Sequence, residues 1–361
     1  MKAQPSAGRV LLCSTAKAGG VIQSATWNSA TGEIGTLHES AKIVSPAFMA
    51  FDRTGGEDRV YVVSEANGSK AIVSAFAADP TTGALQLINT QSSGGDGPTH
   101  VATSPDGRML ALANYSGGSI TTYRIDSRGA LSTPVSHIQY MGHGPNPDRQ
   151  ESAHAHSARF TSDSRFLLVN NFGLDQILIY RVDPLTAVLT PHSTPVWAAK
   201  PGSGPRHIAF HPNGRWIYCL NELDSTVEIL QWDSKAGTVT SAGRVSSLPK
   251  NFPPGKAFSG EIQVSPDGRN LYIGNRVASD TMAVFRIEKA GGGLTLIQLA
   301  NNGGRNTRHF AIDPTGRWLI LCEIASNTVV ILERSASTGR LSEPVHTYPL
   351  ESPMFVGFLP N

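Results

Sequence analysis

The stretch HIAFHPNGRWIYCLNE, residues 207–222, consists of two mainly apolar runs joined by a Pro-Asn-Gly turn. Asn-Gly between two such runs is a strong local signal for a β-hairpin. The same phrase recurs along the chain, with Asp-Gly, Thr-Gly or Asp-Ser at the turn and once with a longer loop. The other copies are AFMAFDRTGGEDRVYVVSEA (47–66), HVATSPDGRMLALANY (100–115), SARFTSDSRFLLVNNF (157–172), EIQVSPDGRNLYIGNR (261–276) and HFAIDPTGRWLILCEI (309–324). The sequence therefore predicts a repeated hairpin unit.

Each unit continues into a third apolar strand, such as TVEILQWD (226–233), and into a fourth that begins with Gly or Thr, such as GALSTPVSHI (129–138). Four strands in a period of roughly 45 to 55 residues are typical of propeller blades. Helical repeats would need a hydrophobic period of about 3.6 residues, which the chain lacks. We expect an all-β chain folded as a seven-bladed β-propeller with four-stranded blades, forming a single domain over residues 1–361.

The two ends of the chain indicate how the ring closes. The first unit, which begins with RVLLCST (9–15), lacks an opening strand. The C-terminal PMFVGFLP (353–360) resembles an opening strand such as PAFMAFD (46–52), and no further strand of the unit follows it. We expect the C-terminal strand to complete the first blade, because closure removes the open edges of a radial array of sheets.

Charge and composition exclude several classes of partner. The chain has 361 residues and a formal net charge of only +2, from 30 Lys and Arg against 28 Asp and Glu. No overall field favours nucleic acid or a membrane surface, and no apolar stretch has the length of about 20 residues that spans a bilayer. Cys13, Cys219 and Cys322 lack metal-site spacing, and a structural disulfide is not expected. Met1 to Gly8 lacks the apolar core of a leader. We expect a cytoplasmic monomer or weak homodimer without a cofactor, or a periplasmic or secreted protein if a leader preceded this numbering.

Positions that differ among the repeats are candidates for function, because a residue that holds every blade together should recur. The last residue of the second strand is polar in every copy and is expected to join neighbouring blades through hydrogen bonds. This slot holds Glu65, Asn114, Asn171, Asn221, Asn275 and Glu323. The residue types in the next slot differ so much among the copies that no shared structural role explains them. This next slot holds Ala66, Tyr115, Phe172, Glu222, Arg276 and Ile324.

A second variable slot lies at the start of the innermost strand. It holds Thr99, His156, Arg206, Gly260 and Arg308. The slot after it has His in three of its five copies, so we expect it to be mainly architectural. It holds His100, Ser157, His207, Glu261 and His309.

Hairpin geometry connects the two variable slots. Arg206 and Glu222 are equidistant from the turn at Asn213-Gly214, so an antiparallel hairpin is expected to place them opposite each other. The same count pairs His156 with Phe172, Gly260 with Arg276 and Arg308 with Ile324. We therefore expect the charged members of these slots to meet at one mouth of the central channel. They are His156, Arg206, Glu222, Arg276 and Arg308.

Three arginines around one carboxylate indicate an anion pocket, since guanidinium groups suit carboxylate and phosphate. A structural network of ion pairs is the alternative. The sequence HAH at 154–156 supplies two imidazoles, but no third ligand lies at a readable spacing, so no metal site is expected.

Four segments resemble the lactonase or cycloisomerase-2 family of seven-bladed propellers. They are PRHIAFHPNGRWIYCLNELDSTVEI (205–229), HAHSARF (154–160), GNRVASDTMAVFRI (274–287) and TRHFAIDPTGRWL (307–319). The resemblance covers most of the chain, from about Pro46 onward, and it implies a catalytic set of His156, Glu222, Arg206 and Arg276. His154 is a less favoured substitute for His156. We assign substrate-binding roles to His154, Arg308 and His207.

The resemblance implies a hydrolase of carbohydrate metabolism that opens a sugar-acid δ-lactone. 6-Phosphogluconolactone, an intermediate of the pentose phosphate pathway, is the first candidate for this anionic substrate. The arginines would bind the anion and polarise the lactone carbonyl. His156 is the favoured general base, because the ordinary pKa of His lies nearer to working pH than that of a Glu beside arginines. A deeply buried Glu222 would reverse the roles of the two residues. The alternatives are a cycloisomerase of the carboxy-cis,cis-muconate cyclase type and a non-catalytic propeller that binds a protein partner.

Overall fold

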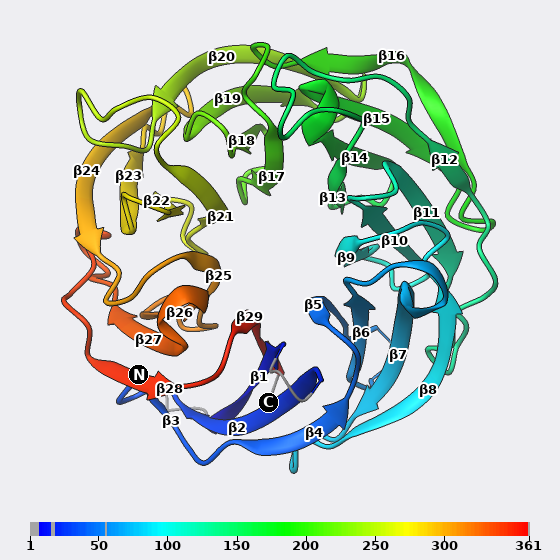
Figure 1. Ribbon diagram of the computed structural model, residues 1–361, viewed down its shortest axis with the longest axis horizontal. Coiled ribbons are helices and arrows are strands. Elements are labelled where there is room, and N and C mark those ends of the chain that lie inside the picture. Colours follow the sequence, from blue (N-terminus) through cyan, green and yellow to red (C-terminus); the bar gives the residue numbers. More distant parts are fainter. Residues whose placement is uncertain (1–6, 16–18, 55, 360–361) are drawn as a thin grey trace.

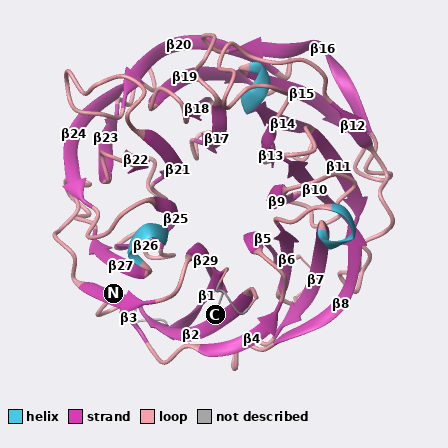
Figure 2. Ribbon diagram, in the orientation of Figure 1, coloured by secondary structure: helices cyan, strands magenta, loops and turns pink. Residues whose placement is uncertain are grey.

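Seven antiparallel β-sheets surround one central channel in the computed structural model (Figure 1). The structure describes residues 7–15, 19–54 and 56–359. In each sheet the strands run from the channel outward in order along the chain, except in the first blade (Figure 2). No helix in this described part of the chain has the length and apolarity needed to cross a bilayer.

The second, third and fourth blades each have four strands. They are β5 (Pro46–Asp52), β6 (Arg59–Ser64), β7 (Ile72–Ala78) and β8 (Leu85–Ser92); β9 (Pro98–Thr103), β10 (Met109–Asn114), β11 (Ser119–Arg124) and β12 (His137–Gln139); and β13 (Ala155–Phe160), β14 (Phe166–Asn171), β15 (Gln176–Val182) and β16 (Leu189–Ala198).

The last three blades repeat the plan. Their strands are β17 (Pro205–Phe210), β18 (Trp216–Asn221), β19 (Thr226–Asp233) and β20 (Thr238–Ser246); β21 (Phe258–Val264), β22 (Asn270–Arg276), β23 (Thr281–Ile287) and β24 (Leu294–Asn301); and β25 (Thr307–Ile312), β26 (Trp318–Glu323), β27 (Thr328–Glu333) and β28 (His346–Pro349). Single turns of 3₁₀ helix occur at η1 (Gly68–Lys70), η2 (Phe172–Leu174) and η3 (Ile324–Ser326).

The first blade combines both ends of the chain. Its strands are β29 (Pro353–Leu359), β1 (Ala7–Ser14), β2 (Val21–Asn28), β3 (Glu33–Ile34) and β4 (His38–Lys42). β29 pairs antiparallel with β1, with Leu11 opposite Gly357, which confirms the closure expected from the sequence. Pro360 and Asn361 lie outside the described residues. The expected single outer strand is instead two short strands, since β3 and β4 both pair with β2.

The turn residues explain why each hairpin forms where it does. Gly107, Gly214 and Gly268 have φ of 69°, 69° and 68°, in the left-handed region that glycine enters without steric cost. In the copy that lacks this glycine, Ser164 adopts a φ of 58°. The Asp-Gly and Asn-Gly turns therefore set the register of the innermost strands, which carry the residues of the site.

At Asn114, Asn275 and Glu323 the polar side chain at the end of the second strand connects neighbouring blades, as the repeat predicts. Asn171 and Asn221 bond to the backbone N of His154 and to Thr226 Oγ1 instead. Asn114 Nδ2 donates to the carbonyl of Ser93 over 3.1 Å, and Asn275 Nδ2 donates to that of Ser247 over 2.8 Å. Ser93 and Ser247 follow the outermost strands of the preceding blades. These strand-end side chains are buried. The core otherwise consists of apolar residues from facing blades, such as Trp27 and Trp318, whose rings pack edge to face 6.5 Å apart between the first and last blades.

Candidate active site at one mouth of the channel

A β-bulge interrupts the ladder near the start of all seven innermost strands. In the fifth blade, Pro205 lies opposite Asn221 and His207 opposite Leu220, so Arg206 is the extra residue. His156 and Arg308 occupy the same position in their blades. The prediction that Arg206 and Glu222 are direct cross-strand partners is therefore wrong in register, and so are the equivalent pairings in the other blades. The residues still meet, because a bulge bends the strand and redirects a side chain.

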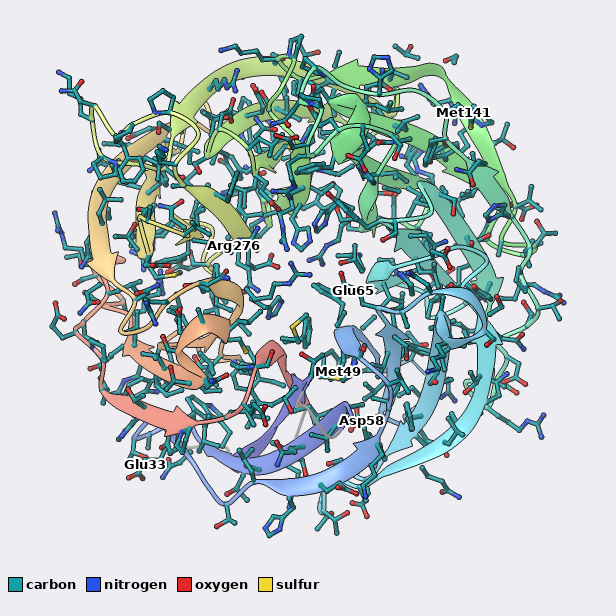
Figure 3. The ribbon with its side chains drawn as sticks, viewed as in Figure 1. Glu33, Met49, Asp58, Glu65, Met141 and Arg276 are labelled. Carbon is teal, nitrogen blue, oxygen red and sulfur yellow. The ribbon has the colours of Figure 1, made fainter. Side chains whose placement is uncertain are left out.

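The same register corrects one repeat alignment. Pro46 pairs with Ser64, as Pro205 pairs with Asn221, so Ser64 holds the polar slot in the second blade. Glu65 consequently occupies the variable slot that holds Glu222 in the fifth blade. Because the loop before this strand is longer than in the other copies, the sequence alignment was shifted by one residue and Glu65 was missed. Figure 3 shows Glu65 and Arg276 on opposite sides of the channel axis.

Glu222 is the centre of the site. Its Oε2 lies 2.9 Å from Arg206 Nε and 2.9 Å from Arg276 Nη2, and its Oε1 accepts a 2.8 Å hydrogen bond from Arg149 Nη2. Only 4 % of the Glu222 side chain is exposed. Arg206 is equally buried, and its guanidinium also donates to the carbonyl of Gly260. The structure thus brings Arg206, Glu222 and Arg276 together, as expected, and adds Arg149.

The electrostatics of this cluster fix its charges near neutral pH. Burial disfavours the ionised form of Glu222, but Arg276, Arg206 and Arg149 outweigh it and lower its pKa to about 2. Burial, Arg276 and Arg308 lower the pKa of Arg206 to about 9, which still leaves it cationic at pH 7. Burial likewise lowers the pKa of Arg276, against the opposing effect of Glu222. The cluster therefore holds a carboxylate among guanidinium ions.

A cavity of about 330 Å³ opens beside this cluster. Its lining comes from six of the seven blades and combines charged, aromatic and small polar side chains. The lining residues are Glu65, Thr99, Tyr115, Arg149, His156, Glu222, Phe258, Arg276, Val277 and Arg308. Four of the predicted residues, His156, Glu222, Arg276 and Arg308, face this cavity, and Arg206 binds Glu222 beside it.

Sequence reasoning missed Arg149 as well as Glu65. Arg149 lies in the long connection between β12 and β13, where the repeat gives no counterpart with which to align it. Its guanidinium packs 5.2 Å from the ring centroid of Phe172 and 5.3 Å from that of Phe258. The sequence offered one indication of its role, which is that Arg149 lies in a connection without the turn motif of the repeat.

His156 lies against the arginines with a neutral ring. Burial lowers its pKa well below 6.5, and the positive charges of Arg206, Arg308 and Arg276 act in the same direction. Its Nδ1 is buried and has no hydrogen-bond partner in the described part of the chain. The ring contacts Tyr115 and His207 at centroid distances of 5.4 and 5.1 Å. His156 is thus unprotonated near neutral pH and contributes to the lining of the cavity.

His154 occupies a different environment. Its ring stacks on Tyr115 at 4.4 Å, its Nδ1 lies 2.9 Å from the Tyr115 carbonyl, and its Nε2 lies 3.1 Å from Glu151 Oε1. Tyr115 lines the cavity, whereas His154 does not. The structure therefore places His154 as a support for Tyr115.

His207 lies in a layer of rings that fills the channel next to the cavity. Its Nδ1 is 2.9 Å from Glu261 Oε2, and the Nε2 of His309 is 3.6 Å from the same oxygen. Burial, together with Arg206, lowers the pKa of His207 well below 6.5. Phe48 packs against the ring of His100 at 4.3 Å, and His309 stacks on Phe355 at 4.0 Å. This layer closes the inner end of the site, and His207 is not among the residues that line the cavity.

A seven-bladed propeller with an arginine-rich pocket at one channel mouth defines the class of protein. Residues 10–358 match the lactonase family of seven-bladed β-propellers, and the chain belongs to this family. It is 32% identical to the 6-phosphogluconolactonase of Bacillus subtilis (strain 168) over 320 residues, which cover 89% of each chain.

Two solved structures extend this likeness to the fold. The periplasmic gluconolactonase of Pseudomonas aeruginosa superimposes with a TM-score of 0.92 at 26% identity, over 98% of this chain and 99% of that one. A crystal structure from Bacteroides fragilis superimposes with a TM-score of 0.90 at 32% identity, over 99% and 100% of the two chains.

Proposed function

We propose that this protein is a lactonase that hydrolyses the δ-lactone of a sugar acid, with 6-phosphoglucono-δ-lactone as the first candidate substrate. Its membership of the lactonase family and its likeness to a 6-phosphogluconolactonase and a gluconolactonase support this assignment. The observation on which the mechanism depends is that Arg276 and His156 both line the cavity, where Glu222 Oε2 holds the Arg276 guanidinium at 2.9 Å.

Hydrolysis requires a water molecule to attack the lactone carbonyl, and the carbonyl oxygen then gains negative charge. A donor fixed in a desolvated site stabilises that charge more strongly than water does. Arg276 lines the cavity, and Glu222 holds its guanidinium in place at 2.9 Å. Arg276 is therefore the donor that we assign to the carbonyl oxygen.

The attacking water needs a base to take up its proton. Both oxygens of Glu222 accept from arginines and its pKa is about 2, which makes it a poor base. His156 lines the cavity and its ring is neutral near pH 7, so we assign it the role of general base. The proton then passes to the ring oxygen of the lactone as the C–O bond breaks, giving the open hydroxy acid. Glu222 acts as the residue that positions Arg206 and Arg276.

The test is the hydrolysis rate of purified protein on a panel of lactones, with and without phosphate, measured by titration of the released acid. Spontaneous opening is subtracted, and EDTA is present throughout because the proposed mechanism uses no metal. Enzymatic opening of at least one aldono-δ-lactone is expected. Turnover of carboxymuconate without addition of water, and no lactone opening, would instead favour the cycloisomerase.

A further inference from the structure

Glu65 and Arg308 form a second ion pair at the cavity, in which Glu65 lies across the channel from Arg276 (Figure 3). Arg308 Nη2 lies 3.3 Å from Glu65 Oε2. The side chains are 21% and 33% exposed, against 2% and 4% for Arg206 and Glu222. The ion pair of Glu65 and Arg308 is therefore longer and more exposed to solvent than the ion pair of Arg206 and Glu222.

The charges at the site do not balance. Four arginines meet two carboxylates there, an excess of two positive charges. Arg149, Arg206 and Arg276 all bind Glu222. Arg308 has Glu65 as its partner in the described part of the chain, and its positive charge lowers the pKa values of His156, Arg206 and Arg276. Arg308 is thus held by the longest of the four arginine–carboxylate contacts at the site, at 3.3 Å against 2.8 to 2.9 Å for the three arginines that share Glu222.

A partly exposed ion pair contributes little stability, so its partners exchange easily for a stronger ligand. A phosphate monoester is such a ligand, because it carries nearly two negative charges at pH 7 and offers several oxygens to a guanidinium fork. Its charge also matches the excess of two positive charges. An uncharged lactone has no group that can displace Glu65 from Arg308.

We propose that Glu65 and Arg308 form an exchangeable ion pair that selects phosphorylated lactones. In the empty site Glu65 compensates Arg308 and reduces its repulsion of the other arginines. When substrate enters, its phosphate replaces the Glu65 carboxylate on Arg308. When product leaves, the Glu65 carboxylate pairs with Arg308 again. This competition limits the affinity of the site for the phosphorylated product. This inference rests on the proposed lactonase function for its substrate, but it also makes predictions about binding alone.

The first experiment compares kcat/KM for 6-phosphoglucono-δ-lactone with that for glucono-δ-lactone. Arg308→Gln should lower the ratio of the two values by about 10- to 100-fold, because hydrogen bonds to charged groups contribute to that extent. Glu65→Gln should raise the ratio severalfold and strengthen inhibition by 6-phosphogluconate. The double variant should behave like Arg308→Gln, since Glu65 acts through Arg308. Arg305→Gln is the matched control, because it removes the same charge from an exposed residue that does not line the cavity.

The second experiment measures binding of 6-phosphogluconate and gluconate by calorimetry, which needs no turnover. Weaker binding of 6-phosphogluconate to Arg308→Gln and tighter binding to Glu65→Gln support the proposal, even for a protein that opens no lactone. Lactone hydrolysis with an unchanged ratio in both variants would overturn the proposal and leave the lactonase function intact. Equal losses of gluconate and 6-phosphogluconate affinity in Arg308→Gln would also overturn it, because the arginine would then bind a carboxylate.

Discussion

The Nε of Arg206 donates a 2.9 Å hydrogen bond to Oε2 of Glu222, and both side chains are almost fully buried. The two residues come from the bulge of β17 and from the residue after β18, so the fold itself brings them together. Breaking a buried ion pair by removing one charge leaves the other without compensation, which is costly. Glu222 is therefore a structural element of the site as well as a part of its chemistry.

Glu222→Gln is expected to destabilise the protein by about 3 kcal/mol at pH 7, because Arg206 and Arg276 lose their shared counter-charge. The pKa of Glu222 is lowered to about 2, so its contribution is present above its ordinary pKa of 4.5 and is lost as the pH falls toward 2. Urea unfolding at pH 7 and pH 3.5 measures this, and the deficit should be smaller at pH 3.5. Glu65→Gln is the control and should change stability by about 1 kcal/mol or less. Equal effects of the two variants at pH 7 would contradict the account.

Glu323 should make the stability of the last blade depend on pH in the opposite sense. Its carboxyl is fully buried and accepts a 2.7 Å hydrogen bond from Thr307 Oγ1, and burial raises its pKa to about 8. A raised carboxyl pKa means that the folded state holds a proton which the unfolded state releases above about pH 4.5. Stability is therefore lost as the pH rises from about 4.5 to 8, with a total of about 5 kcal/mol.

Glu323→Gln should remove this loss. Its melting temperature should match that of the wild type at pH 5 and exceed it at pH 8.5, as scanning calorimetry can show. Asn275→Asp, which places a carboxyl in the equivalent slot, should introduce a new pH dependence. A wild-type protein that loses no stability between pH 5 and 8.5, relative to Glu323→Gln, would show that Glu323 is not held protonated.

Ring closure depends on the C-terminal strand β29. Phe355 is 5% exposed and packs on Phe48 and His309, at ring-centroid distances of 4.5 and 4.0 Å. Phe355→Ala should cost about 3–5 kcal/mol, the usual range for a buried Phe. Leu87→Ala, at a residue that is 57% exposed, should have little effect. Deletion of residues 355–361 should cause early melting or aggregation by opening an edge. A truncated protein with an unchanged melting temperature would refute the shared blade.

The pH dependence of catalysis distinguishes His156 from a solvent-exposed His. Because burial and the arginines lower the pKa of His156 well below 6.5, its basic form persists on the acid side of neutrality. With uncharged glucono-δ-lactone, kcat/KM corrected for spontaneous opening should stay level from pH 8 down to about 6. The uncharged substrate avoids the titration of a phosphate group. An inflection above pH 6.5 that disappears in His156→Asn would contradict the assigned environment.

The repeat allowed the fold and the core of the site to be predicted from the sequence. Arg206, Glu222, Arg276 and Arg308 stand out because they break a pattern that recurs in every blade. The predicted strand pairing was wrong at the bulges, because the sequence pattern of apolar residues does not show where an extra residue is inserted. Glu65 was missed for a related reason, since a longer loop shifted its copy by one position.

Arg149 could not be found from the repeat, because the connection that carries it has no counterpart in the other blades. His154 was predicted to bind substrate, but its position in the structure does not support that role. Its neighbour at two residues' distance, His156, faces the cavity, whereas His154 stacks on Tyr115. Spacing along a strand does not separate these two roles, because the bulge at His156 changes the direction of the chain between them.

The most direct test of the account is kcat for hydrolysis of 6-phosphoglucono-δ-lactone by the wild type and by His156→Asn, with spontaneous opening subtracted. The account predicts wild-type turnover and a decrease of roughly 10²- to 10⁴-fold in kcat for His156→Asn, the usual contribution of a general base. The melting temperature of the variant should stay near that of the wild type. Full kcat in His156→Asn, or no turnover of any lactone by the wild type, would contradict a lactonase site at this channel mouth.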